Sequence, residues 1–120
     1  MSEPAAHTHH AIDYIEITVT DVAAAKQFYG EAFGWTFNDY GPGYAGIRGE
    51  TREQGGLAQG EKPARGGPLV VLFSRDLDAT LTAVKSAGGA IVKEPFAFPG
   101  GRRFQFTDPS GNELAVWAER

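Results

Sequence analysis

Apolar and polar positions alternate or recur along the chain in patterns that predict short strands and two helices. From Asp13 to Thr20 the side chains alternate, which is typical of a strand with one covered face. Residues 22–33 carry apolar side chains at helical spacing. Asp21 is placed to cap the free N–H groups of the first turn, and Gly34 is placed to end the helix. The chain therefore begins with a predicted strand followed by a helix.

Turn residues divide the rest of the chain into further elements. Asp76 caps a second predicted helix with an apolar face from Leu77 to Gly88. Asp108-Pro-Ser-Gly111 predicts a tight turn before the last strand. Residues 69–73 are continuously apolar, which indicates a strand covered on both faces. The remaining strands are expected at Trp35–Tyr40, Tyr44–Arg48, Gly55–Gln59, Ala90–Phe98, Arg102–Thr107 and Glu113–Ala118.

The two halves of the chain repeat one pattern. Asp21 corresponds to Asp76 and Gly34 to Gly89, both at an offset of 55 residues. A repeat of this size indicates one supersecondary unit used twice. The predicted class is α+β, with two βαβββ modules in tandem inside a single domain over residues 11–120. The expected boundaries are a flexible tail 1–10, module one 11–60, a Gly/Pro-rich linker 61–67 and module two 68–120.

Composition removes several classes of function. The chain has 120 residues, a net charge of −4 and no cysteine, so disulfide frameworks and thiolate chemistry are excluded. The acidic balance argues against a nucleic-acid partner, which requires a basic stripe. No apolar run approaches the roughly 20 residues of a membrane span, and no signal-peptide core is present. We expect a cytoplasmic protein without a membrane partner.

The repeated motifs resemble those of the vicinal oxygen chelate superfamily, which includes glyoxalase I, bleomycin-resistance proteins, methylmalonyl-CoA epimerase and extradiol dioxygenases. The residues that carry the resemblance are Val19-Thr-Asp21, Phe28-Tyr29, Phe33-Gly34-Trp35, Ala87-Gly-Gly89 and Phe106-Thr-Asp-Pro-Ser-Gly-Asn-Glu-Leu114. The resemblance implies two modules whose mixed sheet curls around a cleft, with a second copy of the chain completing a homodimer. It says little about chemistry, because one scaffold hosts many functions.

The resemblance also implies where a metal would be held, on four His or Glu ligands facing the cleft. Those positions correspond here to Tyr14, Leu69, Ala115 and a residue near Ala58. Alkyl side chains offer no lone pair to a divalent ion. We therefore expect no metal and no other cofactor at the inherited site.

A shifted metal site is the alternative. Glu16 shares a strand face with Tyr14, and Glu113 shares one with Ala115, so a rearranged divalent site would give a lyase, isomerase or dioxygenase. The simpler interpretation is that both are solvated charges on an open sheet face, and we prefer it. The histidines His7, His9 and His10 all lie in the tail, where they could form only an adventitious site. Whether the chain is an enzyme stays open at this point, as does a subunit role without a ligand.

The cleft is predicted to bind a small molecule. Trp117 lies on the face of Ala115, and Tyr14 replaces a ligand with an aromatic ring and a hydroxyl group. Arg102 and Arg103 either clamp an anion or form a solvated pair. The leading hypothesis is metal-independent binding of a small, partly aromatic or cationic molecule, in the manner of bleomycin-resistance proteins. The candidate ligand-binding residues are Tyr14, Glu16, Arg103, Gln105, Glu113 and Trp117.

Overall fold

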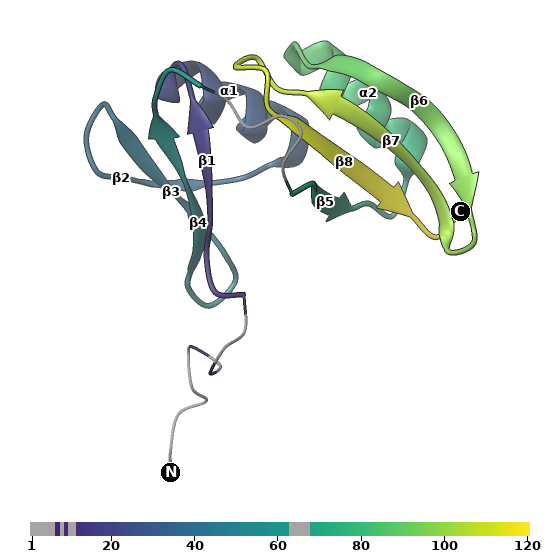
Figure 1. The fold of residues 1–120 in the computed structure, drawn as a ribbon, viewed down its shortest axis with the longest axis horizontal. Coiled ribbons are helices and arrows are strands. Elements are labelled where there is room, and N and C mark those ends of the chain that lie inside the picture. The colour runs from purple at the N-terminus through teal and green to yellow at the C-terminus, as the bar shows by residue number, and fades with distance from the viewer. Residues whose placement is uncertain (1–6, 8, 10–11, 63–67) are drawn as a thin grey trace.

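The computed structural model describes residues 7, 9, 12–62 and 68–120 and confirms two successive βαβββ modules in this part of the chain (Figure 1). The tail 1–10 and the linker 61–67 fall largely outside the described residues, so those boundaries stay predictions. The elements are β1 (Ile15–Val19), α1 (Val22–Phe33), β2 (Phe37–Asp39), β3 (Tyr44–Arg48), β4 (Glu53–Gln59), β5 (Val70–Phe73), α2 (Leu77–Ala87), β6 (Ala90–Phe98), β7 (Gly101–Thr107) and β8 (Glu113–Ala118).

Each module forms its own four-stranded mixed sheet. The strand orders are β1-β4-β3-β2 and β5-β8-β7-β6, and only the first pair in each order is parallel. The parallel pairs arise because a helix crosses over between the first strand of a module and its neighbour. The two sheets stay separate and are not closed into a barrel. The predicted α+β class with tandem modules is thus confirmed, with two sheets in place of one continuous sheet.

Both helices begin and end as their sequences predict. The Asp21 carboxylate accepts a hydrogen bond from the Ala24 N–H at 3.0 Å, and Asp76 does the same for Ala79 at 3.1 Å. Gly34 ends α1 in the left-handed conformation with φ 73°. The second helix ends at Ala87, and its left-handed C-cap is Gly88, one residue before the Gly89 that the repeat offset indicates. In the described ranges, no helix combines the length and apolar character needed to cross a membrane.

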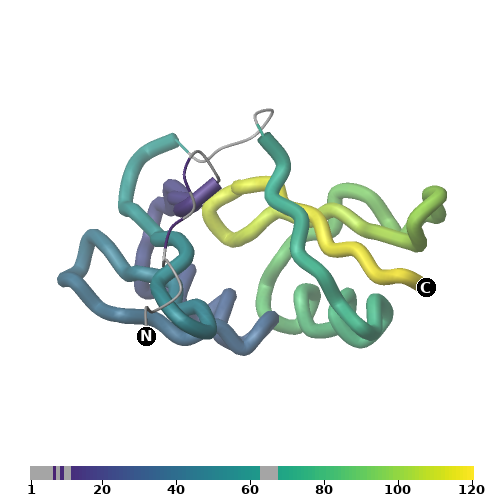
Figure 2. Tube along the Cα trace, turned by 90° about the horizontal axis from the view of Figure 1, so that it is seen from below, coloured from purple at the N-terminus to yellow at the C-terminus, as the bar shows by residue number. Residues whose placement is uncertain are grey.

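One hydrophobic core serves both modules. The helices lie on the same side of the two sheets, behind them in Figure 1 and towards the lower edge of Figure 2, and they contact each other. Phe28 of α1 is 1% exposed, and its ring centroid lies 6.1 Å from that of Phe106 on β7. Tyr29 stacks on Trp35 with a centroid distance of 4.6 Å. Because the same aromatic cluster holds both sheets, neither module buries its core alone.

A buried polar junction also ties the modules together. Asp108 accepts a hydrogen bond from the Tyr29 hydroxyl at 2.9 Å and from the backbone N–H of Asn112 at 2.9 Å. Asn112 in turn donates to the Thr18 carbonyl at the end of β1, at 2.7 Å. Burial, together with the neighbouring Asp108, raises the pKa of Tyr29, so this phenol stays a donor. The Asp-Pro-Ser-Gly-Asn motif therefore acts as a structural junction.

The interpretation of residues 69–73 as a doubly covered strand is wrong. Val70 and Leu72 of β5 pack toward the core, but Val71 is 43% exposed and Phe73 is 52% exposed. The reason is that β5 is an edge strand of its sheet, whose alternate side chains point away from the helices. The apolar run thus covers the core with one side and leaves apolar surface on the other.

Candidate functional site

Each sheet has one face covered by helices and one open face, and the open faces carry the candidate site. We call the open face of the first sheet face A and that of the second sheet face B. Face A comprises Tyr14, Glu16, Asn38, Tyr40, Tyr44, Gly46, Glu53 and Gly56. Face B comprises Val71, Phe73, Phe96, Phe98, Arg103, Gln105, Glu113, Ala115 and Trp117.

Face A is a hydrogen-bonded cluster of tyrosines and glutamates. The hydroxyl groups of Tyr14 and Tyr44 are hydrogen-bonded to each other. Each phenol has one proton, which it can donate to the other phenol or to a carboxylate: the Tyr44 hydroxyl lies 3.1 Å from Oε2 of Glu16, and the Tyr14 hydroxyl lies 3.2 Å from Oε2 of Glu53. Two phenols therefore connect two carboxylates that come from different strands of the sheet.

Glu53 is the most heavily hydrogen-bonded carboxylate of face A. Its Oε1 accepts from the Asn38 side-chain amide at 3.0 Å and from the Tyr40 hydroxyl at 2.7 Å. These two hydrogen bonds, with a smaller contribution from Tyr14, lower the pKa of Glu53. The hydrogen bond between Tyr40 and Glu53 also raises the pKa of Tyr40, whereas desolvation is the main cause of the raised pKa of Tyr14. At neutral pH the cluster consists of an ionised Glu53 surrounded by neutral hydroxyl donors.

Two glycines in the middle strands make room for this cluster. A Cβ atom at Gly46 would lie 1.9 Å from Oε1 of Glu53, and one at Gly56 would lie 2.0 Å from the Tyr44 hydroxyl oxygen. Glycine inside a strand costs about 0.5–1 kcal/mol relative to alanine. The carboxylate and the phenol thus lie flat on the sheet, where a side chain at either position would displace them.

Sequence patterning missed Glu53 because a β-bulge hides it. The predicted fourth strand began at Gly55, but β4 starts at Glu53, and its register with β3 shifts between Ile47 and Arg48. The extra residue returns Glu53 to the open face, which strict alternation cannot anticipate. The glycine pair 55–56 after Glu53-Gln54 is the signal that could have indicated a bulge.

Face B combines a polar chain with exposed aromatic rings. Arg103 donates to Gln105 at 3.1 Å, and Gln105 donates to Glu113 at 2.6 Å. The Arg103 guanidinium also lies over the Phe96 ring, 5.3 Å from its centroid, while its Nε is buried without a hydrogen-bond partner. Trp117 is the strand neighbour of Arg103. Its ring lies at 5.1 Å from Phe73 and 6.1 Å from Phe98, in both cases edge to face.

The predicted binding residues divide between the two faces. Tyr14 and Glu16 lie on face A, and both contact Tyr44. The other four candidates, Arg103, Gln105, Glu113 and Trp117, are neighbours on face B. Glu16 and Glu113 meet only at the junction of the modules, where both line a cavity of about 210 Å³ beside Val70.

The donor set at the inherited metal positions does not fit a metal ion. Ala58, Leu69 and Ala115 present alkyl groups, and Tyr14 is engaged with Tyr44 and Glu53. Over the described ranges, no three His, Asp or Glu side chains come close enough together to hold a metal ion. His7 contacts Asp13, and His10 lies outside the described residues.

Comparison with known proteins gives a consistent family. The family model of the Glyoxalase/Bleomycin resistance protein/Dioxygenase superfamily matches residues 11–116. "Putative glyoxylase CFP32" of Mycobacterium tuberculosis is 28% identical over 118 residues, which is 88% of this chain and 44% of that protein. The "Anthracycline biosynthesis protein DauV" of Streptomyces sp. strain C5 is 31% identical over 124 residues, 87% of this chain and 45% of that protein. The chain thus spans less than half the length of these curated relatives.

Solved structures share the fold. A glyoxalase/bleomycin resistance protein/dioxygenase family enzyme from Burkholderia phytofirmans superposes with a TM-score of 0.77 at 17% identity, over 91% of this chain and 98% of that chain. The protein ATC0852 from Agrobacterium tumefaciens gives a TM-score of 0.74 at 23% identity, over 90% and 96% of the two chains. At these identities the likeness extends to the fold alone.

Proposed function

The chain belongs to the Glyoxalase/Bleomycin resistance protein/Dioxygenase superfamily, and from the chemistry of its open faces we propose that it binds a small organic cation with an aromatic part, without a metal ion. The cationic group is held on face A. The aromatic part stacks against the rings of face B. The protein works as a homodimer in this proposal, with face A of one protomer opposite face B of its partner, because the two faces of one chain lie on separate sheets. Binding requires no covalent step.

The observation that supports cation binding most directly is the uncompensated negative charge of face A. Glu16 and Glu53 belong to one hydrogen-bonded cluster, and no lysine or arginine of the described residues forms an ion pair with either carboxylate. A cation placed beside two carboxylates gains favourable coulombic energy. A protonated amine also supplies N–H donors for carboxylate lone pairs that the tyrosines leave open.

Face B supports an aromatic part of the ligand. Phe73 is 52% exposed, and Trp117 lies between it and Phe98. Exposed aromatic surface beside a tryptophan is typical of sites that stack planar molecules. The relative named for anthracycline biosynthesis suggests that planar organic molecules are within the reach of this family.

Dimerisation rests on the same exposed surface and on the length of the relatives. Val71 and Phe73 on the edge strand β5 leave apolar area that a second copy would cover. Relatives more than twice as long as the matched segment have room for two such domains in one chain. A molecular mass of two chains by light scattering at micromolar concentration is expected, and a monomer mass would refute this part.

Tryptophan fluorescence tests the binding proposal. The chain has two tryptophans, so Trp35→Phe leaves Trp117 of face B as the only reporter. Tyramine, titrated in the presence of EDTA, is expected to change the Trp117 emission with a saturable curve. Glu53→Gln should weaken the affinity about tenfold or more, because charge-assisted hydrogen bonds contribute about 1.5–3 kcal/mol.

The matched control is Glu31→Gln, which removes the same charge from the exposed surface of α1. It should leave the tyramine affinity within a factor of two. Binding that appears only with an added divalent cation and disappears in Glu113→Ala would instead support a rearranged metal site. The absence of any saturable binding would refute the proposal.

A further inference from the structure

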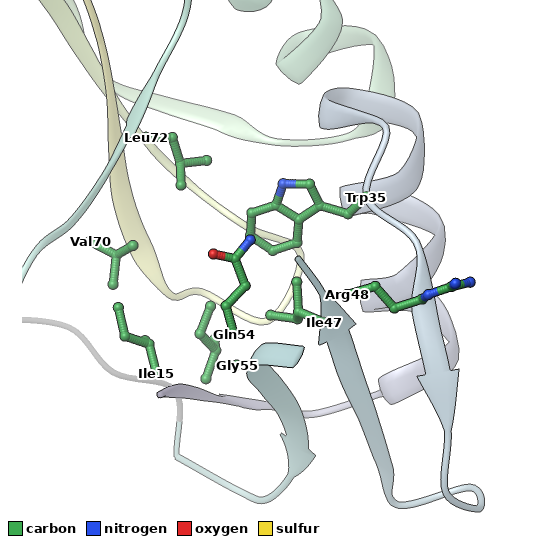
Figure 3. Close-up of a pocket in the computed structure, with 9 residues that line it drawn as sticks. Ile15, Trp35, Ile47, Arg48, Gln54, Gly55, Val70 and Leu72 are labelled. Carbon is green, nitrogen blue, oxygen red and sulfur yellow. The ribbon is translucent and has the colours of Figure 1, made fainter. Parts of the chain in front are cut away.

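A second cavity lies between the two modules, on the covered side of the sheets, and it shares Ile15, Ile17 and Val70 with the junction cavity that Glu16 and Glu113 line. Its volume is about 200 Å³ (Figure 3). The first module contributes Ile15, Ile17, Trp35, Ile47, Arg48, Gln54 and Gly55, and the second contributes Val70 and Leu72. The cavity therefore lies where the edge strands β1 and β5 approach each other without pairing.

The lining of this cavity is apolar except for the carboxamide of Gln54 and the side chain of Arg48. Branched aliphatic side chains of β1, β3 and β5 form its walls, and the indole of Trp35 stands at its centre in Figure 3. The carboxamide of Gln54 points toward that indole, while the Arg48 side chain extends away from the cavity. No acidic side chain lines it. The cavity opens to solvent on one side, where Gln54 is exposed and Ile15 is 41% exposed. A charged ligand would lose part of its hydration here without gaining a counter-ion, whereas one neutral polar group can exchange a hydrogen bond with Gln54.

Size restricts the occupant further. An apolar cavity of about 150 Å³ takes up benzene, and drug-sized molecules need about 300 Å³ or more. A volume of about 200 Å³ thus suits a single six-membered ring with one small substituent. A protein partner is a poor fit, since a stable interface needs about 800 Å² from each side and this opening lies between two strands.

We propose that this inter-module cavity is a separate binding site for a neutral one-ring molecule that carries a single carbonyl or hydroxyl group. The ring packs between Trp35 and the aliphatic side chains of β1 and β5. The polar group exchanges a hydrogen bond with the Gln54 carboxamide. Because Val70 and Ile15 belong to different modules, the occupant bridges them and stabilises their arrangement. This inference is independent of the function proposed for faces A and B.

Calorimetric and NMR titration with cyclohexanone tests the site in the full chain. The expected result is saturable binding with shifts of the Gln54 side-chain amide and the Trp35 indole N–H resonances. At a concentration of about ten times Kd, the ketone should raise Tm by about 5 °C. Gln54→Leu should weaken cyclohexanone about tenfold while leaving methylcyclohexane, which has no polar group, within twofold. Cyclohexylamine at neutral pH should not bind there.

A cavity-filling pair of variants provides the matched control. Val70→Phe places a ring inside the cavity and should abolish cyclohexanone binding, whereas Val92→Phe makes the same change on the exposed surface of β6 and should not affect it. If Val70→Phe does not fold, contacts between cyclohexanone and the Leu72 methyl groups in the unmodified protein decide the matter. The proposal would be overturned if binding does not saturate or if Val70→Phe has no effect on it. A change of oligomeric mass in Val70→Phe would also overturn it and would indicate that a second copy of the chain occupies the cavity.

Discussion

Face A and face B occupy matching places in the two modules, yet their side chains are arranged differently. On face A the middle strands carry Gly46 and Gly56, and long polar side chains lie flat over them. On face B the matching positions of the middle strands carry Gln105 and Ala115, and exposed aromatic rings such as Phe73 lie beside them. The comparison shows that the absence of a Cβ at two strand positions lets the phenols and carboxylates of face A lie on the sheet, where they hydrogen-bond to one another.

Removing the common core should abolish both faces at once, which is the largest effect we expect. Phe106→Ala deletes a fully buried ring that contacts Phe28 and Phe33, so the free energy of unfolding should fall by about 3–5 kcal/mol. Urea denaturation should show a single transition at lower midpoint. Phe73→Ala, on the exposed part of face B, should cost less than about 1 kcal/mol. Two separate transitions would mean that the modules are independent.

Adding one carbon atom should damage face A alone. Gly56→Ala places a Cβ 2.0 Å from the Tyr44 hydroxyl and 2.8 Å from that of Tyr14, so both phenols must move. Tyramine affinity should fall at least about tenfold, since the carboxylates lose their oriented partners. Gly43→Ala is the matched control, because no atom lies within 4 Å of the added Cβ there. Equal affinities in the two variants would show that face A does not bind the amine.

Removing the ring of face B should have a smaller effect on binding. Trp117→Ala should weaken tyramine about threefold to tenfold, which is the usual contribution of aromatic stacking, about 0.5–1.5 kcal/mol. The loss should be similar for a neutral analogue such as 4-ethylphenol, whereas Glu53→Gln should affect only the amine. A calorimetric titration of both compounds separates the two contributions. Loss of amine selectivity in Trp117→Ala would contradict this division of roles.

A pH titration of the tyrosines of face A should give the smallest effect of the four. The pKa values of Tyr14, Tyr40 and Tyr44 are all raised, so absorbance at 295 nm should show little tyrosinate in the folded protein near pH 10. Stability should decline above pH 10, because the unfolded phenols ionise first. Glu53→Gln should lower the pKa of Tyr40 in particular, because the hydrogen bond to the Glu53 carboxylate raises it. In acid, stability should fall as the pH is lowered. The stabilising contribution of ionised Glu53 is present above the pKa of the unfolded state, and it is lost as the pH falls through the lowered pKa of the folded state.

Much of the framework could be predicted from the sequence, because local signals encode it. The capping residues Asp21 and Asp76 and the repeat itself placed both helices and the module order. Face B was also partly predicted, since alternation correctly separated Arg103 and Gln105 from the buried Phe104 and Phe106.

What could not be predicted depends on register and on contacts between distant segments. The position of Glu53 follows from a bulge between β3 and β4, and the exposure of Val71 follows from the edge position of β5. The cavity at Trp35 exists only because two edges approach without pairing. None of these features produces a periodic pattern of apolar residues in the sequence, so patterning alone cannot indicate them.

The junction at Asp108 has a consequence for how the polypeptide can be handled. Its carboxylate and Asn112 connect to Tyr29 and Thr18, which lie at least 79 residues away in the chain. Two separate peptides, divided between the modules, would still share these bonds and the aromatic contacts beneath them. Such fragments should reassemble when mixed, which would allow each open face to be isotopically labelled or chemically altered without touching the other.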